Sequence, residues 1–168
     1  MIEFDAVDLR LLDVLQDDAS LSNQDLAVRV AVSPATCLRR VKRLVEAGVI
    51  QKRVALLAPD SLGAGLSAIL EITLDRQGAE HLAAFESRAV QENAVQQCWR
   101  VSPGPDFVLV VQVADMPAYH AFTQRLLTQD ANVRNIKAFF SVSRAKFDTR
   151  IALPAVTLSP SLKTPREG

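Results

Sequence analysis

Residues 33–48 read SPATCLRRVKRLVEAG, and this stretch carries the start and stop signals of one helix. Ser33 is the expected N-cap, and Pro34 suits the first helical position because its missing N–H is not needed there. Gly48 is expected just past the end, where a left-handed residue commonly closes a helix. The stretch therefore predicts a helix over residues 34–47.

At 100° per residue, the apolar side chains of this helix gather on one face. They are Leu38, Val41, Leu44 and Val45, with Cys37 at the edge as a small packed hydrophobe. Thr36, Arg39 and Arg43 fall on the opposite face, and Arg40 and Lys42 on its flanks. We expect the arginine face to point outward, where Arg can bind guanine edges and Thr a thymine methyl group or a phosphate.

Two amphipathic segments precede this helix. Residues 5–17 have apolar side chains at helical spacing, with Asp5 as the expected N-cap. Ser22 begins a shorter segment, with Asp25 three residues later in an approximate capping box. A connection of about three residues then joins this short helix to the basic one, which is typical of a helix-turn-helix.

Charge is segregated along the chain, although its 19 basic and 19 acidic side chains cancel. Residues 1–25 hold seven acidic side chains and one basic, whereas residues 34–53 hold six basic and one acidic. The basic stretch is interpreted either as a polyanion-binding stripe or as a solvated face ion-paired with the acidic first helix. The tight turn and the one-sided arginines favour DNA. The predicted DNA-binding residues are Ser33, Thr36, Arg39, Arg40, Lys42, Arg43, Lys52 and Arg53.

The second half of the chain predicts a separate domain. Residues 49–58 are rich in β-formers and alternate at Val54, Leu56 and Ala58, and Pro59 to Gly65 form a hinge. The later periodicity gives strand, helix, strand, strand, helix, strand, which is the ferredoxin-like βαββαβ order. The expected fold class is α+β. The expected divisions are a helix-turn-helix domain at 1–50, a strand and hinge at 51–64, a ferredoxin-like domain at 65–154 and a disordered tail at 155–168.

The two helices of that second domain are expected to cover one face of its sheet. The other face is then expected to carry Ile69, Val108, Val110, Phe139 and either Trp99 or Cys98. This is too much apolar surface to leave in water, so a homodimer formed by pairing of sheets is predicted.

Several classes of protein are excluded by what the chain contains. Two cysteines make no disulfide framework, and no apolar run approaches the length of a membrane span. The acidic N-terminus lacks the basic region of a signal peptide, so a cytoplasmic protein is expected. His81 and His120 lie apart from any metal-ligand spacing, and there is no GxGxxG, P-loop or GxSxG motif. We expect neither an enzyme nor a metal or cofactor site.

The chain resembles the Lrp/AsnC family, the feast/famine transcriptional regulators, over about residues 5–154. The motifs that carry the resemblance are DxxDxxLLxxL at 5–15, LAxxVxVSP at 26–34, RVxxLxxxGVI at 40–50 and LG at 62–63. The resemblance implies a winged-helix-like DNA-binding domain and a ferredoxin-like (RAM) domain that dimerises through its sheet. It also implies an amino acid or related effector between subunits, and assembly of dimers into octamers. The alternative is an effector-binding oligomer of this fold with weak or lost DNA binding.

The family's loop before the third strand of the second domain usually reads Val-Thr-Gly-x-x-Asp, whereas residues 101–106 read VSPGPD. Asp106 matches, but Pro103 replaces a glycine and has no N–H to donate, so a different effector or none is expected. Asp106 is interpreted equally as a ligand for an ammonium group or as a turn-capping residue. The effector residues that the resemblance implies are Trp99, Ser102, Gly104, Asp106, Phe139 and Ser141.

Overall fold

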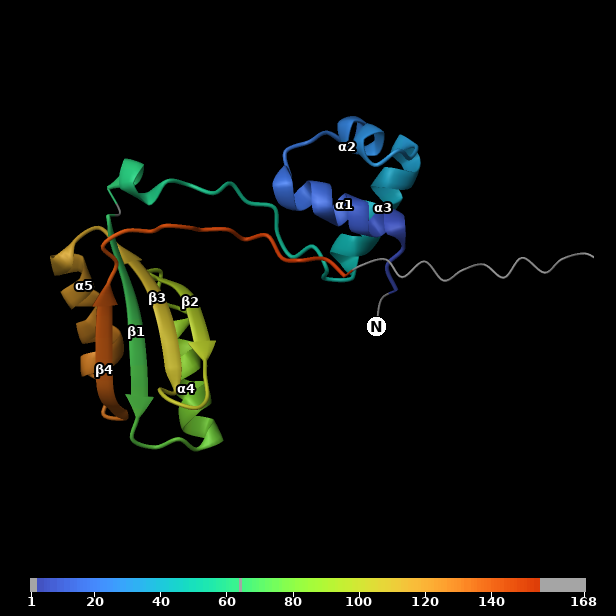
Figure 1. Ribbon diagram of the computed structural model, residues 1–168. Coiled ribbons are helices and arrows are strands. Elements are labelled where there is room, and N and C mark those ends of the chain that lie inside the picture. The colour runs from blue at the N-terminus through green and yellow to red at the C-terminus, as the bar shows by residue number, and fades with distance from the viewer. Residues whose placement is uncertain (1–2, 64, 155–168) are drawn as a thin grey trace, which may run out of the picture. The chain divides into compact units, whose positions relative to one another are not determined.

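The computed structural model describes residues 3–63 and 65–154, whose contacts divide into two units (Figure 1). One unit contains the chain up to Leu56 together with the segment that begins at Phe147, and the other runs from Leu57 to Lys146. Each unit has its own hydrophobic core. The two predicted domains are therefore present as separate packing units.

The first unit is built from α1 (Ala6–Asp17), α2 (Asn23–Arg29) and α3 (Pro34–Glu46). Each helix has a side-chain cap: the carboxylate of Asp5 accepts from two backbone N–H groups of α1, and Ser22 and Ser33 cap the other two. These caps satisfy N–H groups that a helix cannot pair internally. The helices enclose a small core, which includes the buried residues Leu11, Leu26, Ala27, Val30, Cys37 and Val41.

The buried face of α3 is narrower than its apolar pattern predicts. Cys37 and Leu44 are fully buried, as expected, but Leu38 is 60% exposed and Val45 is 48% exposed. The expectation that Leu38 and Val45 pack in the core is therefore wrong. The short helix α2 and one side of α1 cover only a narrow strip of α3, which leaves the flank that carries these two residues in solvent.

The strand expected within residues 49–58 is absent, because residues 51–58 form neither helix nor strand. A strand needs a hydrogen-bonded neighbour, and among the described residues none pairs with this segment. Val54 and Leu56 are accordingly 66% and 61% exposed. A short helical turn at Pro59–Leu62 follows and ends at Gly63, whose φ of 70° favours glycine.

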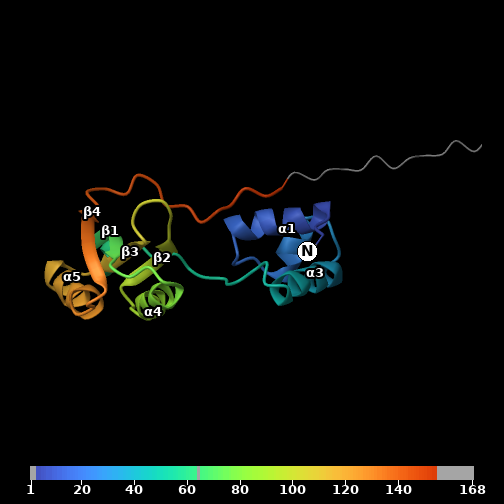
Figure 2. The same ribbon diagram turned by 90° about the horizontal axis from the view of Figure 1, so that it is seen from below.

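The second unit has the predicted βαββαβ order. Its elements are β1 (Leu66–Leu74), α4 (Ala79–Ala89), β2 (Val95–Arg100), β3 (Phe107–Val113), α5 (Met116–Thr123), a further helical turn at Gln124–Thr128, and β4 (Val133–Phe140). The strands form one antiparallel sheet in the order β2-β3-β1-β4. Both helices cover the same face of this sheet (Figure 2).

Strand alternation separates the covered face of the sheet from the open one. Along β3, Phe107, Leu109, Val111 and Val113 are buried beneath the helices, and the residues between them are not. The open face carries exposed apolar side chains, as predicted. Ile69 is 46% exposed, Phe139 52% and Trp99 58%. Cys98 packs partly against the core, so Trp99 is the β2 residue that belongs to the open face.

The end of the described chain belongs to the first unit, which differs from the expected boundary at residue 154. Residues 147–154, here named the return segment, contact α1. The Arg150 guanidinium lies 2.5 Å from a carboxylate oxygen of Asp13, and the Gln16 amide exchanges two hydrogen bonds with the backbone of Ile151. The predicted disordered tail at 155–168 lies outside the described residues.

Candidate nucleic-acid interface and effector site

The turn between α2 and α3 sets the direction of α3 relative to α2. Ala31 takes up a left-handed backbone conformation with φ of 57°, which residues other than glycine adopt infrequently. The backbone N–H of Val32 donates to the carbonyl of Ala27, and the Asn23 amide donates to the carbonyl of Pro34. The turn is therefore tied to both helices, although no glycine in the sequence marks it.

The first turn of α3 places two of the predicted DNA-binding residues together. The Ser33 hydroxyl accepts from the backbone N–H of Thr36 at 3.2 Å and donates to the Thr36 hydroxyl oxygen at 2.9 Å. Both residues sit where the positive end of the helix dipole favours an anion. Ser33 thus has a capping role in the structure, and Thr36 lies half-buried beside it.

The four basic residues of α3 fall into two pairs with different surroundings. Arg39 is exposed and has no hydrogen-bond or ion-pair partner among the described residues. Lys42 is exposed and has only a loose 3.7 Å contact with Glu46 one turn along the helix. Arg40 and Arg43 instead reach carboxylates at the start of α1. We refer to Asp5, Asp8, Arg40 and Arg43 as the ion-pair cluster.

The ion-pair cluster is centred on Asp8, the one buried charged side chain in the described part of the chain. Its Oδ1 lies 2.9 Å from Arg40 Nη1 and its Oδ2 lies 2.5 Å from Arg43 Nη2. Arg40 Nη1 also lies 2.7 Å from Asp5 Oδ2. The hydrogen bond from the backbone of Asp8 and the charge of Arg40 lower the pKa of Asp5, and hydrogen bonds to Asp5 and Asp8 raise the pKa of Arg40.

The ion-pair interpretation of the basic stretch holds for Arg40 and Arg43, and Arg39 is left exposed. Arg40 is only 21% exposed and is bound to two carboxylates, as the ion-pair interpretation expected. Arg39 projects freely, as the DNA interpretation expected. The charge pattern predicted ion pairs with the first helix but did not single out Asp8 as the carboxylate that binds both arginines. Lys52 and Arg53 are exposed in the segment that follows the helices.

A single protomer does not bring the predicted effector residues together. Asp106 lies beside Ile72, to whose carbonyl its N–H donates, whereas the N–H of Ser141 donates to the carbonyl of Ser67. The two anchoring positions on β1 are five residues apart, which is roughly 16 Å along a strand. The loop with Ser102, Gly104 and Asp106 is therefore at one end of the sheet, and Ser141 is at the other.

Trp99 and Phe139 lie on the open face but on opposite edge strands. Trp99 on β2 pairs with Val108 on β3, and Phe139 on β4 pairs with Ile69 on β1. The Trp99 indole N–H donates to the side chain of Gln97 at 3.0 Å. These two aromatic residues frame the apolar face and do not line one pocket within the chain.

Asp106 has a structural role within its own protomer. Its Oδ2 accepts from the backbone N–H of Leu74 at 2.7 Å and from the Gln77 amide at 3.2 Å. Its backbone carbonyl accepts from Val101, which closes the loop. Asp106 therefore joins the loop to the end of β1, in keeping with the interpretation of this residue as a turn anchor. The loop also contains a cis Ser102–Pro103 peptide bond and a Gly104 with φ of 124°.

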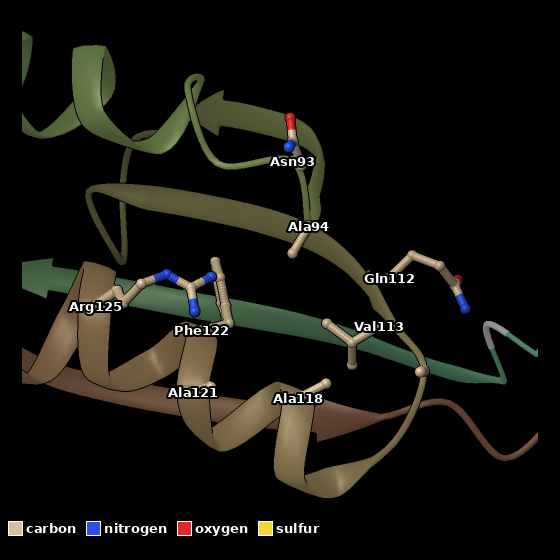
Figure 3. A pocket seen from close by; sticks show the side chains of 9 residues that line it. Asn93, Ala94, Gln112, Val113, Ala118, Ala121, Phe122 and Arg125 are labelled. Carbon is tan, nitrogen blue, oxygen red and sulfur yellow. The ribbon is translucent and has the colours of Figure 1, made fainter.

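A separate hollow of about 430 Å³ lies between α5 and the start of β2 (Figure 3). Ala118, Ala121 and Phe122 of α5 form one wall, and Arg125 lies at its rim. The Arg125 guanidinium is held by Glu92 at 3.0 Å, which raises the pKa of the arginine. None of the predicted effector residues lines this hollow, so it is not the expected site.

The described residues contain no group of three or more His, Cys, Asp or Glu side chains that could hold a metal ion. None of their helices is long and apolar enough to cross a membrane. Burial raises the pKa of both cysteine thiols, which disfavours the reactive thiolate.

Comparison with known proteins gives matches to both units. Residues 4–51 match a family described as winged helix-turn-helix DNA-binding, and residues 67–151 match the Lrp/AsnC ligand binding domain. An uncharacterised HTH-type transcriptional regulator of Haemophilus influenzae is 38% identical over 91% of each chain. The Bkd operon transcriptional regulator of Pseudomonas aeruginosa is 38% identical over 84% of this chain and 93% of its own.

Solved structures share the fold of the chain. An AsnC family transcriptional regulator from Agrobacterium tumefaciens is 31% identical with a TM-score of 0.82, covering 89% of this chain and 97% of its own. A transcriptional regulator from Neisseria meningitidis, solved as a complex with L-Met, is 30% identical with a TM-score of 0.80 and the same coverage. The fold expected from the sequence, α+β with a helix-turn-helix and a ferredoxin-like domain, is confirmed.

Proposed function

The chain belongs to the Lrp/AsnC family of DNA-binding transcriptional regulators, and from this premise we propose that α3 reads double-stranded DNA in the major groove. One observation carries the assignment: Arg39 is exposed and unpaired among the described residues on the side of α3 opposite its buried face. An arginine in this position can bind guanine O6 and N7 together. Thr36, Lys42, Lys52 and Arg53 supply further contacts to bases or phosphates, and Arg40 holds α3 in place.

The DNA-binding proposal is tested with the DNA that lies upstream of the protein's own gene. Arg39→Ala is expected to lose about 1–3 kcal/mol on the specific site and to relax base preference at one position. Lys52→Ala is expected to weaken binding evenly across sequences and to make the dependence on salt shallower. Fluorescence anisotropy over a range of salt concentrations measures both. An Arg39→Ala protein that binds like the wild type would show that α3 is not the reading helix.

We propose further that the open face of the sheet pairs with a second copy of the chain. Ile69, Trp99 and Phe139 make this face apolar, and no described element of the chain covers it. A two-fold dimer would bury the same patch on both subunits and place two α3 helices for half-sites about 34–36 Å apart or a multiple of this spacing. Assembly of dimers into octamers, which the family resemblance implies, is measured by light scattering.

The effector proposed for the second unit is an apolar amino acid. A structural neighbour at 30% identity was solved with L-Met, and a leucine-responsive regulatory protein of Rhizobium meliloti is 36% identical over 86% of this chain. The loop at Ser102–Asp106 and the far end of β4 at Ser141 are separated within one protomer. We propose that the two-fold dimer brings the loop of one subunit to Ser141 of the other.

Thermal shift and calorimetry with each common amino acid test the effector proposal. A bound ligand raises the thermal midpoint as its concentration exceeds its Kd. Asp106→Ala and Ser141→Ala are both expected to abolish the ligand-dependent part of the shift, whereas Arg125→Ala, at the separate hollow, is expected to retain it. A full shift in Asp106→Ala would remove the loop from the site. No shift with any amino acid for the wild type would indicate that Pro103 has closed the pocket.

A further inference from the structure

We propose that Asp8 limits the sequence-independent affinity for DNA, because it holds Arg43 on a protein carboxylate and keeps it away from the phosphate backbone. This inference rests on the proposed reading of DNA by α3. It concerns a residue of α1, which does not itself belong to the reading helix. Asp8 would act through Arg43 and is therefore a positioning residue.

The geometry of Asp8 is that of a fixed anchor. Its side chain is 1% exposed, and its two oxygens serve different arginines. Oδ2 also accepts from the backbone N–H of Asp5 at 3.2 Å, which completes the capping box of α1. A carboxylate offers about four lone-pair positions, so most of its capacity is occupied. A buried and well-paired carboxylate of this kind is costly to displace.

The two arginines are held to different degrees. Arg40 is 21% exposed, contacts two carboxylates, and has an Nε atom that is buried and unpartnered among the described residues. Arg43 is 50% exposed, and among the described residues its side chain forms an ion pair only with Asp8. Arg43 therefore has both the solvent access to reach a phosphate and a single interaction that prevents it. Arg40 is mostly buried and is held by two carboxylates, and its departure would leave the buried charge of Asp8 with one partner fewer.

Holding Arg43 back lowers the affinity for DNA of any sequence and makes its dependence on salt shallower. Contacts to phosphate carry no sequence information, and each neutralised phosphate strengthens binding to every DNA sequence. With Arg43 bound to Asp8, the surface of α3 contributes Arg39 and Lys42 as free basic side chains. The electrostatic part of DNA binding, which all sequences share, is thus smaller than it would be if all four basic residues of α3 reached phosphates.

Asp8→Asn is the variant that tests this inference. Asn keeps the shape of the side chain and one oxygen acceptor but removes the charge, and Arg40 keeps its 2.7 Å contact with Asp5. Release of Arg43 is expected to steepen the log–log salt slope for a random-sequence duplex by about 0.9. Between about 50 and 200 mM salt, the affinity of the variant should then fall about threefold more than that of the wild type. The ratio of specific to non-specific affinity should change little, because a phosphate contact strengthens both.

Two matched variants separate this effect from a change in folding. Arg43→Gln in the otherwise wild-type chain is expected to change the salt slope by much less than the value of about 0.9 that one phosphate contact contributes. The reason is that Asp8 already neutralises Arg43. The double variant Asp8→Asn with Arg43→Gln is expected to return to the wild-type slope. A structural defect alone would lower binding in both Asp8→Asn proteins and would not steepen the slope. Circular dichroism and the thermal midpoint report the fold of each protein.

Each outcome decides the inference. A folded Asp8→Asn protein with an unchanged or shallower slope would overturn it. If Asp8→Asn does not fold, Arg43→Gln alone decides, since a slope that falls by about 0.9 would place Arg43 on phosphate in the wild type. Arg39→Ala separates this inference from the proposed reading of DNA by α3. If Arg39→Ala weakens specific binding and Asp8→Asn leaves the salt slope unchanged, only the role of Asp8 fails.

Discussion

Replacing Phe139 by Ala tests the open face of the sheet as a dimer interface. Phe139 lies on β4 beside Ile69 and is 52% exposed in the single chain. With about 200 Å² for a fully exposed phenylalanine, about 100 Å² remains to be covered, which corresponds to about 2.5 kcal/mol. A two-fold dimer contains the residue twice, which gives about 5 kcal/mol as an upper bound. Imperfect packing and the remaining Cβ reduce this energy by about half, to about 2.5 kcal/mol. The variant dimer should therefore be roughly 70-fold weaker in Kd.

Sedimentation velocity over a range of protein concentrations measures this loss directly. Val90→Ala is the matched control, because Val90 is 62% exposed at the end of α4 and lies away from the sheet face. Phe139 does not belong to the buried core, so Phe139→Ala is expected to keep its circular dichroism spectrum. An unchanged dimer in Phe139→Ala, or a wild-type protein that is monomeric at micromolar concentration, would refute sheet pairing.

Three further properties follow from the structure. Arg150→Ala removes exposed ion pairs with α1 that are worth about 0.2–1 kcal/mol. Amide hydrogen exchange in the return segment should therefore become faster, whereas the free energy of global unfolding should change little. The pKa of Asp5 is lowered below its ordinary 3.8 by the Asp8 N–H and by Arg40, so its stabilisation is complete above pH 3.8 and lost as pH falls through the lower native value. The thermal midpoint of Asp5→Asn should therefore decline less in acid than that of the wild type. Burial raises the pKa of both cysteine thiols. A thiol reagent at neutral pH should therefore modify the partly exposed Cys98 before the fully buried Cys37, and should modify both more slowly than a free thiol. Faster labelling of Cys37 would contradict the packing of α3.

Local signals were sufficient wherever a structural feature depends on neighbours in the sequence. Ser33 with Pro34 marked the start of α3, and the strand pattern placed Ile69 and Phe139 on the open face of the sheet. Periodicity could not tell how wide the buried strip of α3 is, because that depends on how much of α3 the other two helices cover. Leu38 and Val45 were misassigned for this reason. Likewise, the apolar alternation at 49–58 did not form a strand, because a strand also needs a partner.

The sequence by itself determined two domains, the three capped helices, the βαββαβ order and the basic face of α3, since each follows from spacing along the chain. Only the tertiary structure decided which arginines are available to DNA. Asp8 and Arg43 are separated by 35 residues in the sequence, yet their side-chain atoms lie 2.5 Å apart. In the same way, β-sheet register placed Asp106 and Ser141 at opposite ends of one sheet. The physical reason is that charge pairing and strand register are set by contacts between distant segments, which no local pattern records.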